Sequence, residues 1–534
     1  MNTHIWESAE LSFEATTAYD NPFRDIALYG EFFGPNGEVL RVPGFWDGAQ
    51  TWRIRFAPTA AGRWTWRTLC SKVDDDDLHN RSGELIAAPW SPADIDANPT
   101  RRGFVRVHES GRYFEYADDT PFYWLGDTLW GANTTRFDEK EHLPVYVADR
   151  VAKGFTVIQM VVGRPALYDK PDEALIWTIN EAGMPYTEPF ERINPEYFHY
   201  LDVKIMAMLE AGLVPCLLGG WGPDLETMGV KHFQEFWHYL IARYTAYNVV
   251  WCVAGEYFFA PDVAGWREVG RFVHENDPYE HPTSNHSTAP HSGSRHYQAD
   301  DWYDFNLVQV GHALALRKFM DTLAWDDYHA LPVKPSIMSE SWYEAHPTCL
   351  DEGDFLFDDA DIRLATYIPV LQGCIGQTYG AHGIWSWETE TDPPLGVKYI
   401  GFKSMPHWEE ALHLPGGAQM RHLRDLMDSV AWWELAPHPE IVSATDPCQV
   451  YCAANLGHEY VVYMRNAQKQ VNVFLPPVGS TPDPADYASQ WFDPRTGAWA
   501  DAEPHVTNWY GSFLRWEVIP PDAQDWVLVV RRRT

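Results

Sequence analysis

KHFQEFWHYLIARYTAYNVVWCVAGE, residues 231–256, is the stretch of the sequence that decides the fold. Residues 231–248 carry the apolar pattern of an amphipathic helix, and residues 248–256 form an apolar run typical of a buried strand. A helix that leads directly into a buried strand is the repeating unit of a parallel sheet. The run ends on a carboxylate, Glu256, so the sequence raises a question of function at the same point.

The same alternation of apolar runs and amphipathic stretches extends from about residue 104 to residue 430. One repeat is PEYFHYLDVKIMAMLEAG (195–212), a helix with Pro195 in its first turn and Gly212 at its C-cap, followed by the strand LVPCLLGGWG. Eight strands are predicted, and they end at Asp127, Val162, Gly219, Glu256, His286, Gln309, Glu340 and Trp387. Eight strands with intervening helices predict a (β/α)8 TIM barrel.

The two ends of the chain have a different pattern. Residues 1–95 contain short alternating runs such as RWTWRT, separated by turn signals such as GPNGE, and the last hundred residues return to this alternation. We predict an N-terminal β-sandwich over residues 1–98, a catalytic barrel over 99–432 and a C-terminal β-sandwich over 433–534. The fold class is therefore α/β, with a TIM barrel flanked by two β-sandwich domains.

Composition excludes several partners. The 534-residue chain has a formal net charge of −35, which argues against nucleic acid and against an anionic membrane surface. It has seven scattered cysteines and no CxxC pair, and the N-terminus shows no basic segment followed by an apolar one. We expect a reduced, cytoplasmic protein, and the oligomeric state stays open, a homo-oligomer included.

A second strand also ends on a glutamate. The run SIMSE, within KPSIMSESWYEAHP (334–347), finishes at Glu340, although an unpaired buried charge is costly. Glu256 and Glu340 are 84 positions apart, room for three βα units, which places them on the fourth and seventh strands. Two carboxyl groups facing each other across a barrel mouth are what glycoside hydrolysis requires, one protonated and one ionised. The alternative is that both glutamates pair with barrel arginines.

Other side chains at the strand ends are candidates for sugar binding. Asp127 would bind a pair of hydroxyl groups or cap the next helix, and Arg164 would bind a hydroxyl group or orient a carboxylate. Tryptophan rings at strand ends would stack on sugar faces, although each ring could equally pack in the barrel. The predicted substrate-binding residues are Asp127, Trp130, Arg164, Trp221, His286, Gln309, His312, Tyr343 and Trp387.

No cofactor or metal is expected. The histidines in HPTSNHSTAPHSGSRH (281–296) do not have a familiar zinc spacing, and the residues between them are loop formers. Neither a glycine-rich phosphate loop nor a nucleophile elbow occurs in the required strand–turn–helix context.

Four stretches resemble the barrel of the bacterial apiosidase-like family: TPFYWLGDTLWGANTT, KGFTVIQMVV, NVVWCVAGE and KPSIMSESWYE. That family is similar to the large clan of retaining (β/α)8 glycosidases, and its members often carry an N-terminal β-sandwich and a C-terminal one likened to collagen-binding modules. The resemblance implies Glu340 as nucleophile and Glu256 as acid/base. Two departures bear on the sugar rather than on the reaction. Gly255 stands where clan members typically have Asn, and Glu256 stands where apiosidases often have Asp.

The sequence therefore predicts a retaining glycoside hydrolase. It would remove a terminal sugar, with a furanoside or apiose-like residue among the candidates, from a short oligosaccharide or glycoside. The alternative is a catalytically inactive carbohydrate-binding or scaffolding protein on a glycosidase-like barrel. The two are separated by whether the carboxyl groups of Glu256 and Glu340 meet in one pocket.

Overall fold

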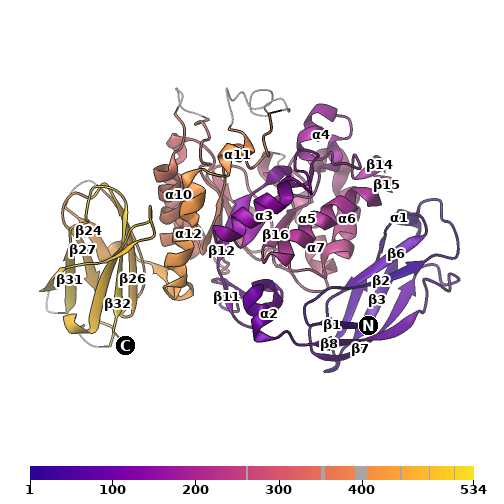
Figure 1. Cartoon of the computed structure of the whole chain (residues 1–534), viewed down its shortest axis with the longest axis horizontal. Helices are drawn as coiled ribbons and strands as arrows, with labels where there is room; N and C mark the ends of the chain where they lie inside the picture. Colours follow the sequence, from indigo (N-terminus) through magenta and orange to yellow (C-terminus); the bar gives the residue numbers. More distant parts are fainter. Residues whose placement is uncertain are drawn as a thin grey trace.

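The computed structural model describes residues 1–259, 262–349, 355–390, 406–445, 448–479, 482–509 and 512–533. Its centre is a curled sheet of parallel strands, which lies between two all-β regions (Figure 1). The parallel strands, in order around the sheet, are β12 (Trp124–Thr128), β13 (Val157–Val161), β16 (Val214–Leu218), β17 (Val250–Cys252), β18 (Thr283–Ser284), β20 (Asn306–Gln309), β21 (Ser336–Glu340) and β22 (Gly376–Tyr379).

The sheet has the strand order of a TIM barrel but not a continuous ladder. β22 pairs with β12, which curls the sheet round, whereas β18 and β20 form no ladder in the described part of the chain. The edge of β20 is instead covered by the antiparallel strand β19 (His291–Ser292). A single backbone bond, from the N–H of Asp304 to the carbonyl of Thr283 at 2.8 Å, spans the gap. The architecture is therefore TIM-barrel-like, with the barrel open at its short fifth strand.

Seven of the eight predicted strands lie where the sequence places them, and the eighth does not. The last barrel strand is GQTY (β22), and the predicted strand GIWSW forms the turns that follow it. In that turn region Gly383 and Trp387 have φ values of 95° and 52°, which are left-handed and incompatible with a strand. β22 begins at Gly376. Only glycine fits there, because a Cβ would come within 2.4 Å of the carbonyl oxygen of Trp124.

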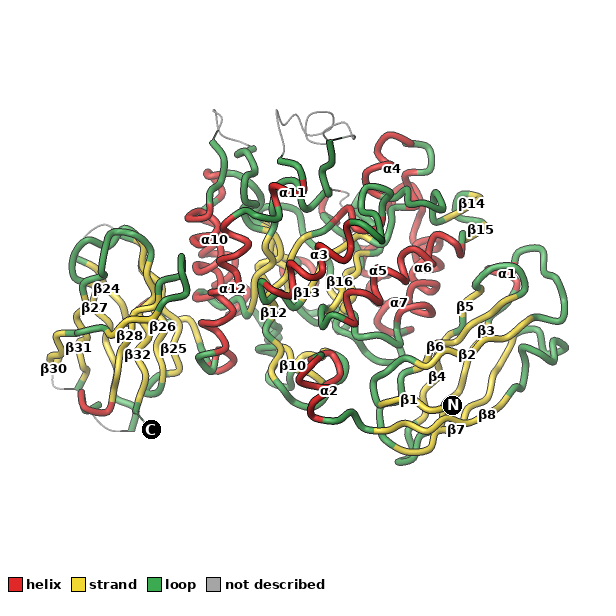
Figure 2. Tube along the Cα trace, in the orientation of Figure 1, coloured by secondary structure: helices red, strands yellow, loops and turns green. Residues whose placement is uncertain are grey.

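Helices cover the outer face of the curled sheet (Figure 2). The longer ones are α3 (His142–Ala152), α5 (Pro195–Glu210), α6 (Asp224–Tyr244), α7 (Val263–Asn276), α9 (Lys318–His329), α10 (Asp359–Leu371) and α12 (Pro415–Asp428). α5 has Pro195 in its first turn, as predicted, and the chain leaves it at Gly212 with a φ of 88°. Along each strand, alternate side chains face the barrel interior and the helix layer, so the core has two concentric shells.

Shorter elements connect these units. α4 (Pro171–Trp177) and α11 (Trp408–Ala411) follow the carboxyl ends of β13 and β22 and lie at the same end of the barrel, at the top of Figure 1. The predicted linker near residue 95 contains α2 (Pro92–Ala97), capped by Ser91, and leads into the hairpin strands β9 (Val105–Val107), β10 (Phe114–Tyr116) and β11 (Pro121–Phe122). The remaining short elements are α1 (Pro22–Asp25), β14 (Tyr186–Glu188), β15 (Arg192–Ile193) and α8 (Ser294–Tyr297).

Each end of the chain forms two sheets around a core of its own. The first N-terminal sheet contains β1 (Asn2–His4), β8 (Ser82–Ala88), β7 (Gly62–Cys70), β3 (Leu28–Phe33) and β4 (Val39–Pro43). The second contains β2 (Ala9–Glu14), β6 (Thr51–Phe56) and β5 (Phe45–Trp46). The first C-terminal sheet contains β23 (Ala436–Pro437), β25 (Gln449–Asn455), β26 (Glu459–Arg465), β32 (Trp526–Arg532), β28 (Tyr487–Phe492) and β29 (Trp499–Asp501). The second contains β24 (Val442–Ala444), β27 (Val471–Leu475), β31 (Phe513–Val518) and β30 (His505–Trp509).

Buried ion pairs fix both all-β regions to the barrel helices. Arg55 of β6 binds Asp202 of α5 at 2.6 Å, and Asp202 also binds Arg243 of α6 at 2.7 Å. On the other side, Arg363 of α10 binds Asp525, just before β32, at 2.6 Å. These pairs lie away from the barrel mouth, because none of them involves a residue at the carboxyl end of a barrel strand.

Among the described residues there is no helix with both the length and the apolar composition that spanning a bilayer would require. The seven cysteines all lie in described segments and form no disulfide bond.

Candidate active site

The ends of β17, β20 and β21 bring three polar side chains together. Gln309, the last residue of β20, places its amide nitrogen Nε2 3.0 Å from Oε1 of Glu256 and 2.8 Å from Oε1 of Glu340. Those two carboxyl oxygens therefore lie at most 5.8 Å apart, the sum of the two distances. Glu256 and Glu340 meet at one point, as predicted from their positions at strand ends.

A bulge in β21 turns Glu340 toward the mouth. Met338 and Glu340 pair with consecutive residues of β20, so Ser339 has no partner of its own. Ile337 belongs to the interior shell and Met338 to the helix-facing shell, so strict alternation would direct Glu340 away from the interior. The extra residue reverses that direction, which is a common use of bulges beside active sites.

Trp221 holds the other carboxyl group. Its indole Nε1–H donates to Oε2 of Glu256 at 3.0 Å. Glu256 itself has a φ of 40°, a strained conformation for a residue with a side chain. Gly255 lies against the indole, and a Cβ at that position would come within 2.2 Å of the ring of Trp221. An asparagine at position 255 therefore does not fit while the indole is in place.

The surroundings favour different protonation states for the two carboxyl groups. Burial, and then the charge of Glu340, raises the pKa of Glu256 to about 7. Burial also acts to raise the pKa of Glu340, but a hydrogen bond from His312 at 3.2 Å and the charges of His312 and His286 hold it below its ordinary value. Near neutral pH, Glu256 is therefore the group that keeps a proton and Glu340 the one that is ionised.

Both carboxyl groups open into a cavity of about 460 Å³. Its walls are largely aromatic, and the indoles contact one another. The ring centroid of Trp221 lies 5.5 Å from that of Trp130, which it meets edge-on, and 5.4 Å from that of Trp177, to which it is tilted. Trp177 also stacks with Trp385 at 6.0 Å. Among the described residues that line the cavity there is no lysine or arginine. The arrangement suits an uncharged ligand with flat apolar faces, such as a sugar.

Seven of the predicted site residues line this cavity, namely Trp130, Trp221, Glu256, Gln309, His312, Glu340 and Tyr343. His312 lies between a catalytic candidate and a sugar-binding candidate. Its Nε2 is 3.2 Å from Oε1 of Glu340, and its ring lies 4.3 Å from that of Tyr343.

Asp127 and Arg164 lie behind the cavity and act through other residues. Asp127 is fully buried and accepts hydrogen bonds from Arg150 and from Tyr146 of α3, each at 2.6 Å, so it neither faces a sugar nor caps a helix. Arg164 forms a buried two-pronged ion pair with Asp224, with bonds of 2.8 and 3.0 Å. Both side chains therefore form buried ion pairs next to the barrel mouth and do not line the cavity.

His286 and Trp387 also lie outside the cavity. His286 is fully buried, with Nε2 3.8 Å from Oε2 of Glu340, so it faces the back of the carboxyl group. Trp387 is fully buried too, stacked on Trp408 at 4.8 Å and packed edge-on against Phe137. The left-handed backbone at Trp387 directs its ring away from the mouth, and Trp385, two positions earlier, provides the cavity wall instead.

Sequence reasoning missed several residues that line the cavity, Trp177, Thr288, His346, Cys349 and Trp385. Trp385 lies in GIWSW, which was predicted as a strand and forms turns, and only Trp387 of this segment was predicted to bind a sugar. Trp177 ends α4, within the long excursion after β13, and only its aromatic character points to a binding site.

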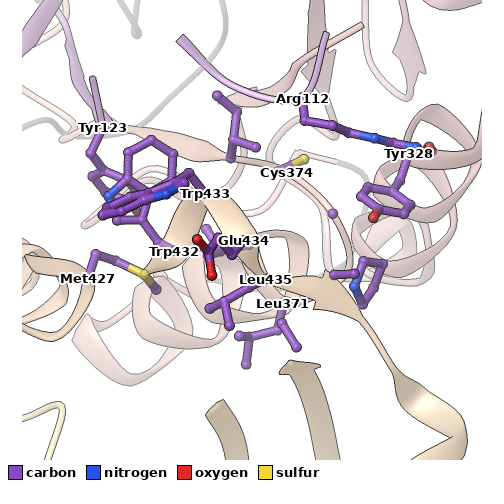
Figure 3. Close-up of a pocket in the computed structure, with 16 residues that line it drawn as sticks. Arg112, Tyr123, Tyr328, Leu371, Cys374, Met427, Trp432, Trp433, Glu434 and Leu435 are labelled. Carbon is purple, nitrogen blue, oxygen red and sulfur yellow. Dashed lines mark hydrogen bonds between the residues drawn. The ribbon is translucent and has the colours of Figure 1, made fainter. Parts of the chain in front are cut away.

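A second cavity, of about 180 Å³, lies between the barrel and the C-terminal region. Figure 3 shows Arg112 beside Tyr328 on one side of it and Trp432 and Trp433 on another. The only acidic side chain among its described lining residues is Glu434, which accepts a hydrogen bond from Asn455 at 2.6 Å. This cavity has no pair of carboxyl groups.

With this geometry in view, a family model described as "Apiosidase-like, catalytic domain" matches residues 108–434, which is more than half of the chain. The chain belongs to the apiosidase-like family. The match contains every predicted site residue of this apiosidase-like protein, both glutamates included. A second model, of a domain of unknown function (DUF5060), matches residues 2–71.

Solved structures agree with the fold. A protein from Bacteroides vulgatus described as a candidate glycoside hydrolase is 21% identical, covers 100% of both chains and has a TM-score of 0.75. A glycoside hydrolase family 5 protein, also from Bacteroides vulgatus, is 21% identical, covers 82% of this chain and 95% of its own, and has a TM-score of 0.69. A search among curated proteins gives no match.

Proposed function

We propose that this apiosidase-like protein is a retaining glycoside hydrolase, with Glu340 as nucleophile and Glu256 as acid/base. The observation that carries the proposal is the approach of the two carboxyl groups, whose nearest bridged oxygens are at most 5.8 Å apart. Retaining enzymes have carboxyl groups about 5–5.5 Å apart, and inverting enzymes about 6.5–9.5 Å, because inversion needs room for a water molecule.

The reaction would have two steps. The ionised Glu340 attacks the anomeric carbon while Glu256 gives its proton to the departing glycosidic oxygen, so the bond to the aglycone breaks as an ester to Glu340 forms. Glu256, now a carboxylate, removes a proton from water, whose oxygen attacks the same carbon and releases Glu340. The protonation states described above are those that the first step needs.

The substrate would be a short oligosaccharide or glycoside, cleaved at a terminal neutral sugar, with a furanoside or apiose-like residue among the candidates. Two features support this class: the aromatic walls of the cavity and the lack of lysine and arginine among its described lining residues. The apolar cores formed mainly within each terminal region support the proposed division into a β-sandwich over 1–98, a barrel over 99–432 and a β-sandwich over 433–534.

A panel of aryl glycosides, furanosides included, tests the proposal. The wild-type protein should hydrolyse at least one of them and release a product that keeps the anomeric configuration, as read by proton NMR at early times. Glu256→Ala should lose most activity on substrates with poor leaving groups but keep a fast first step on activated ones, and azide should partly restore its turnover. An inverted product, or binding of sugars with no turnover of any glycoside, would contradict the proposal.

A further inference from the structure

Gln309 occupies an unusual position, since one amide nitrogen touches both proposed catalytic groups. Its Nε2 carries two hydrogens, and the bonds of 3.0 Å to Glu256 and 2.8 Å to Glu340 use one each. The opposite orientation of the amide would place its carbonyl oxygen against the ionised carboxylate of Glu340, which would repel it. The orientation is therefore fixed by the chemistry of the three groups.

The surrounding structure holds this amide in place. Gln309 is 2% exposed, and the bulge at Ser339 sets it directly opposite Glu340 in the sheet. Its carbonyl Oε1 makes no hydrogen bond to any described residue, so the two carboxyl groups are what direct the side chain. A glutamine whose role was to recognise a sugar hydroxyl would not need both of its N–H groups committed to the enzyme's own acids.

We infer that Gln309 is a positioning residue: it bridges Glu256 and Glu340, fixes their separation, and stabilises the negative charge on whichever of the two is ionised. The inference rests on the proposed function, because it assigns the bridge a part in that reaction. In the free enzyme the charge is on Glu340. In the covalent intermediate Glu340 is an ester and the charge is on Glu256, so a shared donor serves both states without moving.

Removing the bridge should change the pH dependence of the two glutamates. A donated hydrogen bond favours the ionised form of a carboxyl group, so removing the bridge should raise the pKa of both glutamates. One hydrogen bond to a charged group corresponds to a displacement of about one pH unit. The groups that act on the pair from other parts of the site are Trp221, Arg164, His286, His312 and Tyr343. They remain in place, so both limbs of the activity profile should move in the same direction.

Gln309→Met is the test variant, because methionine has nearly the same length and volume but donates no hydrogen bond. Its kcat should fall by roughly 100-fold, as expected for catalytic groups that lose their alignment. Both limbs of its pH profile of kcat/KM should move upward by about one pH unit. Gln377→Met is the matched control: Gln377 of β22 is also a buried barrel glutamine, but its amide donates to the backbone carbonyl of Thr378 at 3.1 Å, so the limbs of its pH profile should stay where they are in the wild type.

A second measurement does not depend on activity. Carboxyl ¹³C titration of protein labelled at glutamate, with Glu256→Gln and Glu340→Gln for assignment, should show both pKa values rising in Gln309→Met and neither rising in Gln377→Met. If Gln309→Met does not fold, Gln309→Asn, whose amide is too short to reach both carboxyl groups, replaces it.

The outcomes separate the two proposals. Unchanged carboxyl pKa values with a raised KM would overturn the bridge and make Gln309 a substrate-binding residue. If the wild type hydrolyses no glycoside but the ¹³C titrations shift as predicted, the bridge stands and the proposed function falls.

Discussion

Replacing Glu256 by glutamine should stabilise the folded protein at neutral and alkaline pH. In the unfolded chain a glutamate has its ordinary pKa of 4.5, whereas burial and the charge of Glu340 raise that of Glu256 to about 7 in the fold. Below pH 4.5 the group is protonated in both states, so it has no effect on the free energy of unfolding. As the pH rises from 4.5 to about 7, only the folded state keeps the proton, and the wild type loses stability progressively.

The size of the effect follows from that displacement. Each unit of difference between the folded and unfolded pKa of Glu256 changes the free energy of unfolding by about 1.4 kcal/mol. The wild type therefore loses roughly 3 kcal/mol of stability above pH 7. A glutamine at this position still faces the N–H donors of Trp221 and Gln309 with only one acceptor oxygen, which reduces the expected gain to about 1–3 kcal/mol.

Urea unfolding over a pH series that spans both values measures the gain. The difference between Glu256→Gln and wild type should be near zero at the acid end and reach its full size at the alkaline end. Glu268→Gln, an exposed position on α7, is the control for loss of a negative charge and should show no such trend. A difference that does not depend on pH, or a wild type that is the more stable protein at the alkaline end, would refute the reasoning.

Lys204 of α5 is fully buried, its ammonium group has no hydrogen-bond partner among the described residues, and burial lowers its pKa to about 8. Lys204→Met should therefore raise the free energy of urea unfolding by about 1–3 kcal/mol at neutral pH, and this gain should shrink as the pH rises above 8. A variant less stable than the wild type at neutral pH would contradict this prediction. Trp385→Ala should raise KM about tenfold, whereas Trp387→Ala should leave KM near its wild-type value. Both indoles are buried, so each variant should lose about 3–5 kcal/mol of stability, and the reverse pattern of KM would place Trp387 in the cavity. Gly255→Asn should displace the indole of Trp221 and lower kcat/KM by at least about tenfold, and an unchanged value would show that the indole is not needed where it lies.

The parallel strands could be predicted because they are buried on both faces. Six of them contain apolar runs, and the pattern is visible without any structure, whereas the fifth, β18, is short and polar. The eighth could not be placed, because GQTY is polar and short while the neighbouring GIWSW is aromatic. The pairing of GQTY with β12 requires glycine at position 376, next to the backbone of Trp124, and only the assembled sheet shows this contact.

The candidate site was predictable where the residue type is costly in a core. A carboxylate at the end of a buried strand needs a reason, so Glu256 and Glu340 were identified from the sequence. Asp127 has the same signal but a different reason, the buried partner Arg150, which comes from another element. The direction of a side chain at a strand end depends on bulges and left-handed residues, such as those at Ser339 and Trp387, and these have no clear mark in the sequence.

The most direct test of the central claim is to trap the covalent intermediate. With a fluorinated glycoside that has a good leaving group, hydrolysis of the glycosyl ester is slower than its formation, so the glycosyl-enzyme accumulates. Peptide mass spectrometry then locates the ester. The account predicts a single label on the peptide that contains Glu340, and no label when Glu340→Gln is treated in the same way. A label on any other residue, or hydrolysis of the parent glycoside with inversion and no covalent species, would contradict the account.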